Sequence, residues 1–303
     1  MNFMKSGIIN VYKEAGFTSF DVVAKMRGIL HVKKIGHTGT LDPDATGVLP
    51  VCIGKATKVC DLLTDKDKTY QAIMHLGIVT DTQDMTGTVL EEHEVHLTEE
   101  VVQQMISRFV GEIQQVPPMY SALKVNGKKL CDLARKGIEV ERKARPVKIY
   151  EIIVEKIEFP LVTMTIHCSK GTYIRTLCDD IGKALGCGAC MEKLVRTKVS
   201  SFSLENSVKL SDIECAVKDG TIEGLILPID EVFSTYPKIV AKAEADKKLT
   251  NGNAIEVTQR TEEQMVVLEG EQVRMYLSNG QFVGIYYVKG HQFVLQKMFL
   301  EKE

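Results

Sequence analysis

Residues 36–47 read Gly-His-Thr-Gly-Thr-Leu-Asp-Pro-Asp-Ala-Thr-Gly. The stretch places one carboxylate, Asp42, among small and hydroxyl residues and directly before a proline. Pro43 lacks an amide hydrogen and the glycines loosen the backbone, so the segment suits neither a helix nor a central strand. It predicts a rigid, irregular loop, and such loops on a rigid scaffold often carry catalytic groups. An Asp-Pro pair is also a common start of an ordinary turn, so a plain turn remains the alternative.

The twelve residues together resemble the signature loop of the bacterial TruB-type tRNA pseudouridine synthases, Gly-His-Thr-Gly-(small)-Leu-Asp-Pro-x-Ala-Thr-Gly. The resemblance implies that Asp42 is the catalytic aspartate and that Asp44, at a variable position, is a bystander. The histidine type alone would make His37 a candidate acid or base. The resemblance instead implies that His37 and Thr38 contact RNA.

The resemblance also implies an activity. A synthase of this type isomerises the uridine at position 55, in the T-loop of tRNA, to pseudouridine. The target base must be flipped out of the loop, because its reacting atoms are inaccessible in a stack. The expected partner is the T-arm of tRNA, without a guide RNA, and the protein is expected to be a monomer. No cofactor is expected, and the Gly54-Lys55-Ala56-Thr57 segment does not match a phosphate-binding loop.

Composition is that of an ordinary globular protein: 303 residues, of which 44% are hydrophobic and 26% charged. No apolar run is long enough to cross a membrane and the first residues lack a signal-peptide pattern, so we expect a cytoplasmic protein. The eight cysteines should then be reduced. Cys187 and Cys190 form a Cys-x-x-Cys pair, but a structural zinc site needs four ligands and no second such pair exists, so we predict no metal or redox site.

Strand and helix patterns alternate along the first two thirds of the chain. Apolar runs predict strands at 7–11, 69–78, 149–159 and 161–168, the last two joined by a turn at Pro160. Helical spacing predicts a helix from near Asp21, capped by Thr18 or Ser19, and another from about Tyr173 to Gly186. A further helix should start at 98–100, carry Phe109 and Val110 on its apolar face, and end before Pro117.

The pattern of the sequence changes after about Tyr236. Short apolar runs at 265–268, 273–277, 282–288 and 293–295 alternate with Gly and Asn turns, which predicts a small all-β unit. This part resembles a PUA-like RNA-binding domain. We therefore expect an α+β fold with a mixed or antiparallel sheet in residues 1–232, of the pseudouridine synthase type, and a PUA-like domain in residues 233–303.

Three further segments match the same family. Asp67-Lys68-Thr69-Tyr70 resembles its Lys-x-Tyr motif and implies that Tyr70 packs on the target base. The Thr80–Gly87 loop implies that Asp84 contacts the bound nucleotide region, although two short acids beside threonines could equally form a turn. Ser169–Thr176 implies that Arg175 pairs with Asp42, and a nearby arginine should lower the pKa of that carboxyl. Leu194 aligns with a leucine that lines the pocket, whereas from the residues alone it is simply core.

A basic strip lies within the segment that resembles the family's insertion over the T-arm, at about 120–148. It holds nine Lys or Arg from Lys124 to Lys148 against three acidic residues, in a chain whose net charge is −2. Such a strip predicts phosphate contacts, and a solvated face explains the charge equally well. The candidate RNA-binding residues there are Lys124, Lys128, Lys129, Arg135, Arg142 and Arg145. With little core of its own, the segment should be mobile without RNA.

One departure from the family pattern is the absence of Asp-Lys-Pro in segment 11–16, which we expect not to touch the site. Two other functions remain possible. A carboxylate-based RNA nucleosidase would use Asp42 and Asp84 as nucleophile and acid. A non-catalytic tRNA-binding or tRNA-folding protein would need neither carboxylate.

Overall fold

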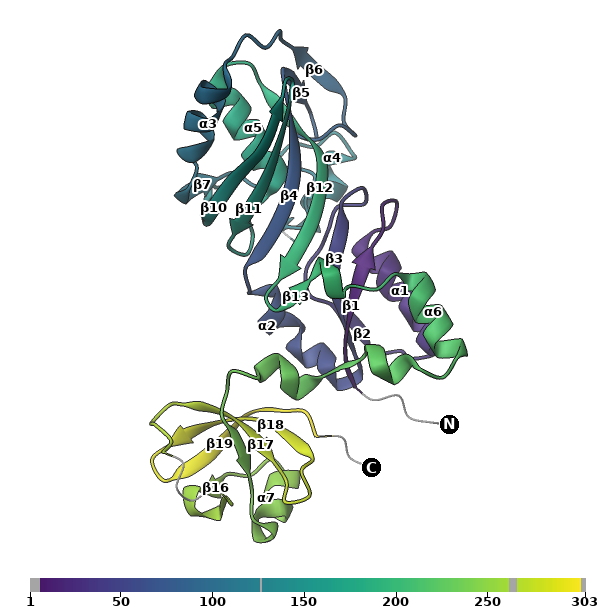
Figure 1. Cartoon of the computed structure of the whole chain (residues 1–303), viewed down its shortest axis with the longest axis vertical. Coiled ribbons are helices and arrows are strands. Elements are labelled where there is room, and N and C mark those ends of the chain that lie inside the picture. The colour runs from purple at the N-terminus through teal and green to yellow at the C-terminus, as the bar shows by residue number, and fades with distance from the viewer. Residues whose placement is uncertain (1–5, 126, 262–265, 301–303) are drawn as a thin grey trace.

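The computed structural model describes residues 6–125, 127–261 and 266–300. Within these ranges the chain forms one ten-stranded sheet and one five-stranded sheet, which lie toward opposite ends of an elongated molecule (Figure 1). In the larger sheet β3 (Thr46–Ile53) pairs in parallel with β12 (Ala189–Val199), while the other pairings are antiparallel. The predicted α+β class with a mixed sheet is therefore confirmed.

The larger sheet runs in the order β14-β1-β3-β12-β4-β11-β10-β7. The remaining strands of this path are β14 (Leu227–Pro228), β1 (Gly7–Lys13), β4 (Lys68–Leu76), β11 (Leu161–Cys168), β10 (Arg145–Glu158) and β7 (Gly111–Gln115). Two short strands join it from the side: β2 (Ile35–His37) pairs with β3, and β13 (Phe202–Ser203) pairs with β12. Two small hairpins stand apart, β5 (Ile78–Thr80) with β6 (Val89–Glu92) and β8 (Lys124–Val125) with β9 (Lys128–Lys129).

Helices α1 (Ser19–Leu30) and α6 (Leu210–Lys218) cover the β1–β3 end of the sheet. Helix α1 begins two residues earlier than expected, because Thr18 forms a capping box with Asp21: its hydroxyl accepts from the Asp21 amide at 3.1 Å, and the Asp21 carboxylate accepts from the Thr18 amide at 2.8 Å. Two shorter helices are α2 (Cys60–Thr64) and α4 (Leu130–Ala134).

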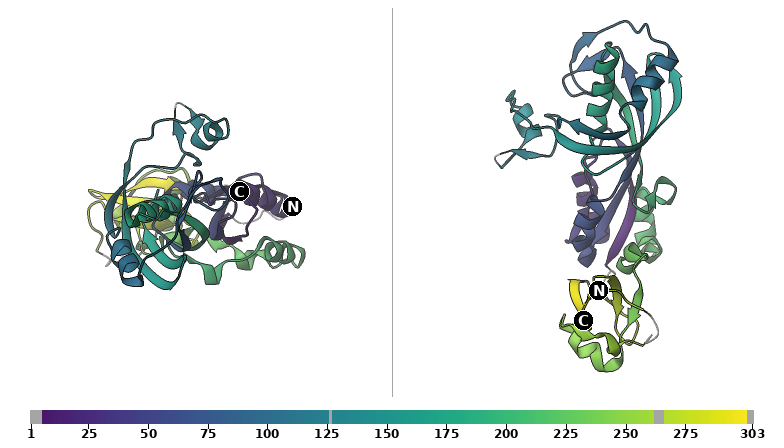
Figure 2. Two further views of the ribbon diagram at one scale, coloured as in Figure 1. Left: turned by 90° about the horizontal axis from the view of Figure 1, so that it is seen from above. Right: turned by 90° about the vertical axis from the view of Figure 1, so that its left-hand side faces the viewer.

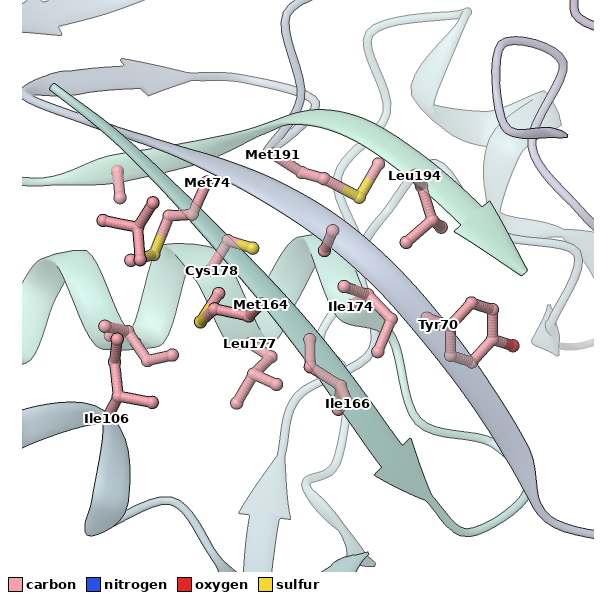
Figure 3. Close-up of a cluster of buried hydrophobic side chains, with 14 of the residues drawn as sticks. Tyr70, Met74, Ile106, Met164, Ile166, Ile174, Leu177, Cys178, Met191 and Leu194 are labelled. Atoms are coloured by element: carbon pink, nitrogen blue, oxygen red, sulfur yellow. The ribbon is translucent and has the colours of Figure 1, made fainter. Parts of the chain in front are cut away.

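Helices α5 (Ile174–Leu185) and α3 (Glu99–Ser107) cover the β4–β11–β10 half of the sheet. Figure 3 shows Met74, Met164 and Ile166 from the strands packed against Leu177 and Cys178 of α5. Burial alternates strictly along β11, which puts every second side chain into this core. This core is what holds the start of α5 beside the ends of β4 and β12.

Several predicted elements differ from the observed ones. The helix expected to continue past Val110 ends at Ser107, and residues 111–115 form β7, so Phe109 and Val110 lie outside the helix. Strand β12 and helix α6 were not predicted. The run 265–268 is not a strand where it is described: Val266 and Leu268 are in a coil and exposed, and Met265 lies outside the described residues. The predicted irregular loop is shorter, since its first two and last two residues belong to β2 and β3.

The C-terminal sheet has the order β15-β17-β18-β19-β16. Its strands are β15 (Lys238–Val240), β17 (Gln272–Tyr276), β18 (Phe282–Lys289), β19 (Gln292–Met298) and β16 (Ile255–Glu256), and α7 (Asp246–Thr250) packs against it. Phe282, Ile285 and Phe299 join a cluster with Val48 and Phe202 of the larger sheet. Lys55 and Lys58 add hydrogen bonds to the carbonyls of Leu300 and Met298. The two sheets thus share apolar and polar contacts.

None of the helices in the described part of the chain combines the length and apolar character needed to span a bilayer.

Candidate active site

Asp42 lies in the irregular segment 38–45 between β2 and β3, and this segment is tied down on several sides. The Leu41 amide donates to the Ser19 hydroxyl at 2.9 Å, and the Pro43 carbonyl accepts from the Gly16 amide at 3.1 Å. Within the loop, the Ala45 amide donates back to the Asp42 carbonyl at 3.2 Å. Neighbouring elements therefore satisfy several backbone groups of the loop and restrain it.

Lys13 is a second anchor of the loop and is fully buried. Its ammonium donates to the carbonyls of Pro43 at 2.8 Å, Phe17 at 2.6 Å and Glu14 at 3.0 Å. Burial lowers the pKa of Lys13 to about 8, although the nearby carboxylates Asp44 and Asp42 act in the opposite direction. The expectation that segment 11–16 does not touch the site is therefore wrong.

Replacing Lys13 by Met should remove the ammonium donor from the carbonyls of Glu14, Phe17 and Pro43, of which that of Pro43 keeps the Gly16 amide as a donor. We expect a loss of unfolding free energy of about 2–3 kcal/mol, together with slower catalysis because the Asp42 loop loosens. Urea unfolding followed by circular dichroism measures the first effect. Lys25→Met is the matched control, because Lys25 is exposed on α1, and equal stability of the two variants would contradict this role.

Arg196 in β12 is a third anchor, and the sequence analysis had not predicted it. It is 1% exposed and donates to the carbonyls of Val48 at 2.7 Å, Gly39 at 3.2 Å and Thr40 at 3.4 Å. Gly47 has φ +106°, and a Cβ there would lie 2.2 Å from the Arg196 carbonyl oxygen, so only glycine lets the two strands meet. The strand also contains Glu192, Lys193 and Lys198, so the residue type alone gave no signal that Arg196 is buried.

Arg175, at the start of α5, contacts Asp42 with two of its nitrogens. Its Nε lies 3.0 Å from Asp42 Oδ2 and its Nη2 donates to Asp42 Oδ1 at 3.3 Å. On its other side Nη1 donates to the Thr82 carbonyl at 3.0 Å and to Asp84 Oδ2 at 3.3 Å. Nη2 also donates to the Tyr120 carbonyl at 2.7 Å. One buried guanidinium therefore joins three segments that are distant in sequence.

Asp84 contacts Arg175 through Nη1, whereas Asp42 contacts it through Nε and Nη2. Besides the arginine, the Asp84 carboxylate accepts from the Thr82 hydroxyl at 2.7 Å and from the Thr86 amide at 3.0 Å. Its side chain is 12% exposed, against 37% for that of Asp42. Asp42 is thus the more accessible of the two carboxylates.

Burial raises the pKa of Asp42, and Arg175 pulls it back only in part, while Asp84 adds to the rise. Arg175 lowers the pKa of Asp42 as predicted, but the pKa stays above its ordinary value, since the cost of desolvation is larger than the attraction of one arginine shared between two carboxylates. Burial also lowers the pKa of His37, with a further contribution from Arg196. His37 is therefore mainly neutral at neutral pH.

A cavity of about 610 Å³ opens over these residues, within the size range of small-molecule sites. Asp42 and Arg175 line it together with Tyr70, Leu194 and Arg145. Tyr70 of β4 and Leu194 of β12 lie at the same end of the sheet core, next to Ile174 (Figure 3). Burial raises the pKa of the Tyr70 hydroxyl although Arg196, opposite it in the strand register, acts to lower it.

The remaining candidate residues of the loop region lie outside the cavity lining. His37 is half-buried in β2, and its Nδ1 accepts from the Gly39 amide at 3.3 Å. Thr38 is 1% exposed, and its hydroxyl has no hydrogen-bond partner among the described residues. Asp44 is exposed at the loop surface. Among the residues that the structure describes, no cluster of three His, Cys, Asp or Glu side chains could hold a metal ion.

The basic segment projects from the body of the protein (Figure 2). Lys124, Lys128 and Lys129 are exposed on the β8–β9 hairpin. Arg135 is exposed after α4, 3.8 Å from Asp132. Arg142 is engaged within the protein instead, donating to the Pro117 carbonyl at 3.3 Å and to Glu139 at 3.0 Å. Arg145 opens β10 and borders the cavity.

Two family models match consecutive parts of the chain. Residues 27–174 match the model of the TruB family pseudouridylate synthase N-terminal domain, and residues 175–234 match that of the tRNA pseudouridylate synthase B C-terminal domain. The tRNA pseudouridine synthase B of Lachnoclostridium phytofermentans is 53% identical over 93% of this chain and 94% of its own length. That of Clostridium kluyveri is 44% identical over 97% of this chain and 99% of its own length.

Solved structures give the same result for the fold. An H/ACA ribonucleoprotein bound to a substrate RNA containing 2′-deoxyuridine contains a chain with a TM-score of 0.72 and 28% identity, covering 97% of this chain and 85% of that one. A Cbf5-Nop10-Gar1 complex gives 0.72 and 30% over the same shares. The predicted PUA-like C-terminal fold is confirmed by this likeness. From these family-model matches and its similarity to relatives over nearly its whole length, the chain belongs to the TruB family of pseudouridylate synthases.

Proposed function

We propose that this protein converts the uridine at position 55, in the T-loop of tRNA, to pseudouridine. The observation that carries the proposal is the Asp42 carboxylate, held by two nitrogens of Arg175 at the wall of a cavity that Tyr70 and Leu194 also line. The curated relatives at 53% and 44% identity carry the name tRNA pseudouridine synthase B. Their full-length similarity supports tRNA as the substrate.

The reaction rearranges one nucleoside without adding or removing atoms overall. The N1–C1′ bond breaks, the uracil rotates, a C5–C1′ bond forms, the C5 proton leaves and N1 gains a proton. The ionised Asp42 adds to C1′, adds to C6, or removes a ribose proton after the glycosidic bond breaks. Each route needs the flipped base within reach of Asp42, and no step needs a metal or nucleotide.

The other residues take supporting roles in this proposal. Tyr70 stacks on the flipped uracil, Leu194 excludes water, and Arg175 orients Asp42. Asp84 acts on the site through Arg175, because its carboxylate contacts the guanidinium and lies outside the cavity lining. His37 contacts RNA beside the cavity, whereas Thr38, which is 1% exposed, offers almost no surface for the RNA contact that the resemblance implied.

Four broader expectations are part of this proposal. The protein acts on tRNA without a guide RNA, as a monomer, in the cytoplasm. A division between residues 232 and 233 separates a catalytic domain from the PUA-like domain, although side chains from both parts share one apolar cluster.

The test uses the purified protein alone and an unmodified T-arm stem-loop. We expect pseudouridine at a single T-loop position after incubation, mapped by reverse transcription after carbodiimide treatment. Release of free uracil would instead support a nucleosidase that uses Asp42 and Asp84. Tight binding with neither product would support a non-catalytic tRNA-binding protein.

Changing the hairpin lysines should weaken tRNA binding through charge. The triple variant Lys124→Gln, Lys128→Gln, Lys129→Gln removes three exposed cations, so we expect a higher Kd and a shallower salt dependence, with the slope reduced by about 0.7–0.9 for each phosphate that is no longer neutralised. Filter binding over a salt series measures both. The control variant removes the same charge at exposed Lys156, Lys209 and Lys218, and an equal effect there would argue against a specific phosphate contact.

The pH dependence of the reaction should reflect the raised pKa of Asp42. The reactive form is the carboxylate, and burial raises its pKa above the ordinary 3.8, so activity should begin to fall at a higher pH than for an exposed aspartate. Single-turnover rates between about pH 4 and pH 8 measure this acid limb. If the rate fell only at or below pH 3.8, the ordinary pKa of an aspartate, the result would contradict the role of burial at this site.

A further inference from the structure

The turn between β5 and β6 contains a residue in an unusual backbone conformation. Gln83 has φ +64°, in the left-handed region that few residues other than glycine adopt. Strained backbone of this kind persists where the surroundings hold it in place, and it is common at functional sites. The contacts of Gln83 show what holds it.

The Gln83 side chain is hydrogen-bonded to helix α5. Its two partners there are Thr176, the residue after Arg175, and Asp179. Its Oε1 accepts from the Thr176 hydroxyl at 2.8 Å, and its Nε2 donates to Asp179 Oδ2 at 2.7 Å. Both partners are 3% exposed. The Gln83 carbonyl also accepts from the Met191 amide of β12 at 3.0 Å. Both ends of the side-chain amide therefore fasten the turn to the helix, and the backbone carbonyl fastens it to the sheet.

The two neighbours of Gln83 in the chain are the residues that hold the far side of Arg175. The Thr82 carbonyl and the Asp84 carboxylate both accept from Arg175 Nη1, at 3.0 and 3.3 Å. A left-handed residue between them turns both groups toward the same nitrogen. The opposite side of the guanidinium, Nε and Nη2, faces Asp42.

We propose that Gln83 is a positioning residue for the isomerisation: its amide, held between Thr176 and Asp179, keeps Thr82 and Asp84 against Arg175 and thereby sets the direction in which Arg175 presents two N–H groups to Asp42. This inference rests on the proposed function. It adds a residue that touches neither the substrate cavity nor Asp42.

The consequence for Asp42 is electrostatic. The charged and titratable groups that interact with Asp42 are Arg175 on α5, Asp84 on the β5–β6 turn, Lys13 on β1, Tyr70 on β4 and Tyr173 before α5. Among the groups that lower the pKa of Asp42, Arg175 contributes most. A turn that no longer holds Arg175 in place weakens this contribution, so the pKa of Asp42 rises further and less of the carboxylate is ionised at a given pH.

The informative variant is Gln83→Glu, which keeps the shape of the side chain and places a second carboxylate against Asp179. We expect the single-turnover rate to be about tenfold slower, which corresponds to the loss of one buried hydrogen bond. The rate should also begin to fall at a higher pH than in the wild type, and the Kd for the T-arm should be unchanged. Asp179→Asn alone keeps an acceptor for Gln83 and should change the rate less than about twofold. The double variant Gln83→Glu, Asp179→Asn exchanges donor and acceptor, because the amide introduced on α5 can donate to the carboxylate introduced on the turn. It should recover most of the wild-type rate.

Gln83→Gly provides a second check, because glycine adopts the left-handed conformation freely but lacks the amide. It should fold well and still lose about as much rate as Gln83→Glu. Thermal unfolding of all variants separates these effects from a loss of stability. Wild-type rates and pH profiles in both Gln83 variants, or no recovery in the double variant, would overturn the role of Gln83. A wild-type protein that makes no pseudouridine would contradict the proposed function instead.

Discussion

The variant Asp42→Asn should make no pseudouridine while it folds and binds a T-arm as well as the wild type does. The amide keeps the shape of the carboxyl but can neither add to carbon nor take up a proton at neutral pH. We expect the single-turnover rate to fall by about 10⁴-fold or more, the scale seen when a group essential to acid–base or nucleophilic catalysis is removed. Asp44→Asn is the control, because Asp44 is exposed on the same loop and should retain full activity.

The same variant should not be less stable at neutral pH. The pKa of Asp42 is higher in the folded protein than the ordinary 3.8 of an unfolded chain, so the ionised carboxylate favours unfolding. This penalty is absent below that ordinary value, where both states are protonated, and it develops as the pH rises through the folded pKa. Urea unfolding of both proteins at neutral and acidic pH measures it. A marked loss of stability in Asp42→Asn at neutral pH would contradict this account of the site.

Replacing Arg175 by Met should destabilise the protein as well as inactivate it. The side chain is 6% exposed and contacts Asp42, Asp84 and two backbone carbonyls, so its removal leaves two carboxylates close together without their cation. Breaking a buried ion pair in this way costs about 3–5 kcal/mol. The loss should appear in urea unfolding and as a lower Tm.

Arg175→Lys tests whether charge alone suffices. A lysine keeps one positive charge but cannot reach both carboxylates and both carbonyls at once, so we expect a partial rescue of stability and little rescue of activity. Lys218→Met is the control, because it breaks an exposed ion pair on α6 and should leave both properties unchanged. Activity near the wild-type level in Arg175→Lys would show that the two-nitrogen contact with Asp42 is not needed.

The sequence predicted the parts of the fold that follow local patterns. The β10–β11 hairpin around Pro160 has alternating apolar residues, and α1 has a capping box. Both were found, with β11 at its predicted bounds, β10 starting four residues earlier and α1 two residues earlier. Strand β7 was missed because the apolar residues after α3 continue the helical spacing. Strand β12 was missed because two irregularities in its pairing with β4 interrupt the alternation that identifies a strand.

The site itself could be predicted only in part. The pairing of Asp42 with Arg175, which are 133 residues apart, came from the family resemblance, since no local pattern links positions at that distance. The resemblance did not indicate how strongly burial acts on Asp42, because that depends on the packing around it. Lys13, Arg196 and Gln83 were not predicted, since each acts through backbone carbonyls or a backbone conformation that the residue type does not reveal.

The central claim is that the Asp42 carboxylate carries out an isomerisation on tRNA. Forming the C5–C1′ bond expels the hydrogen at C5, so a T-arm labelled with tritium at uridine C5 should release it into water. With the purified protein alone, we expect tritium release from the T-loop uridine at the same rate as pseudouridine appears, no free uracil, and no release with Asp42→Asn. Release of uracil without pseudouridine, or undiminished tritium release by Asp42→Asn, would contradict the account.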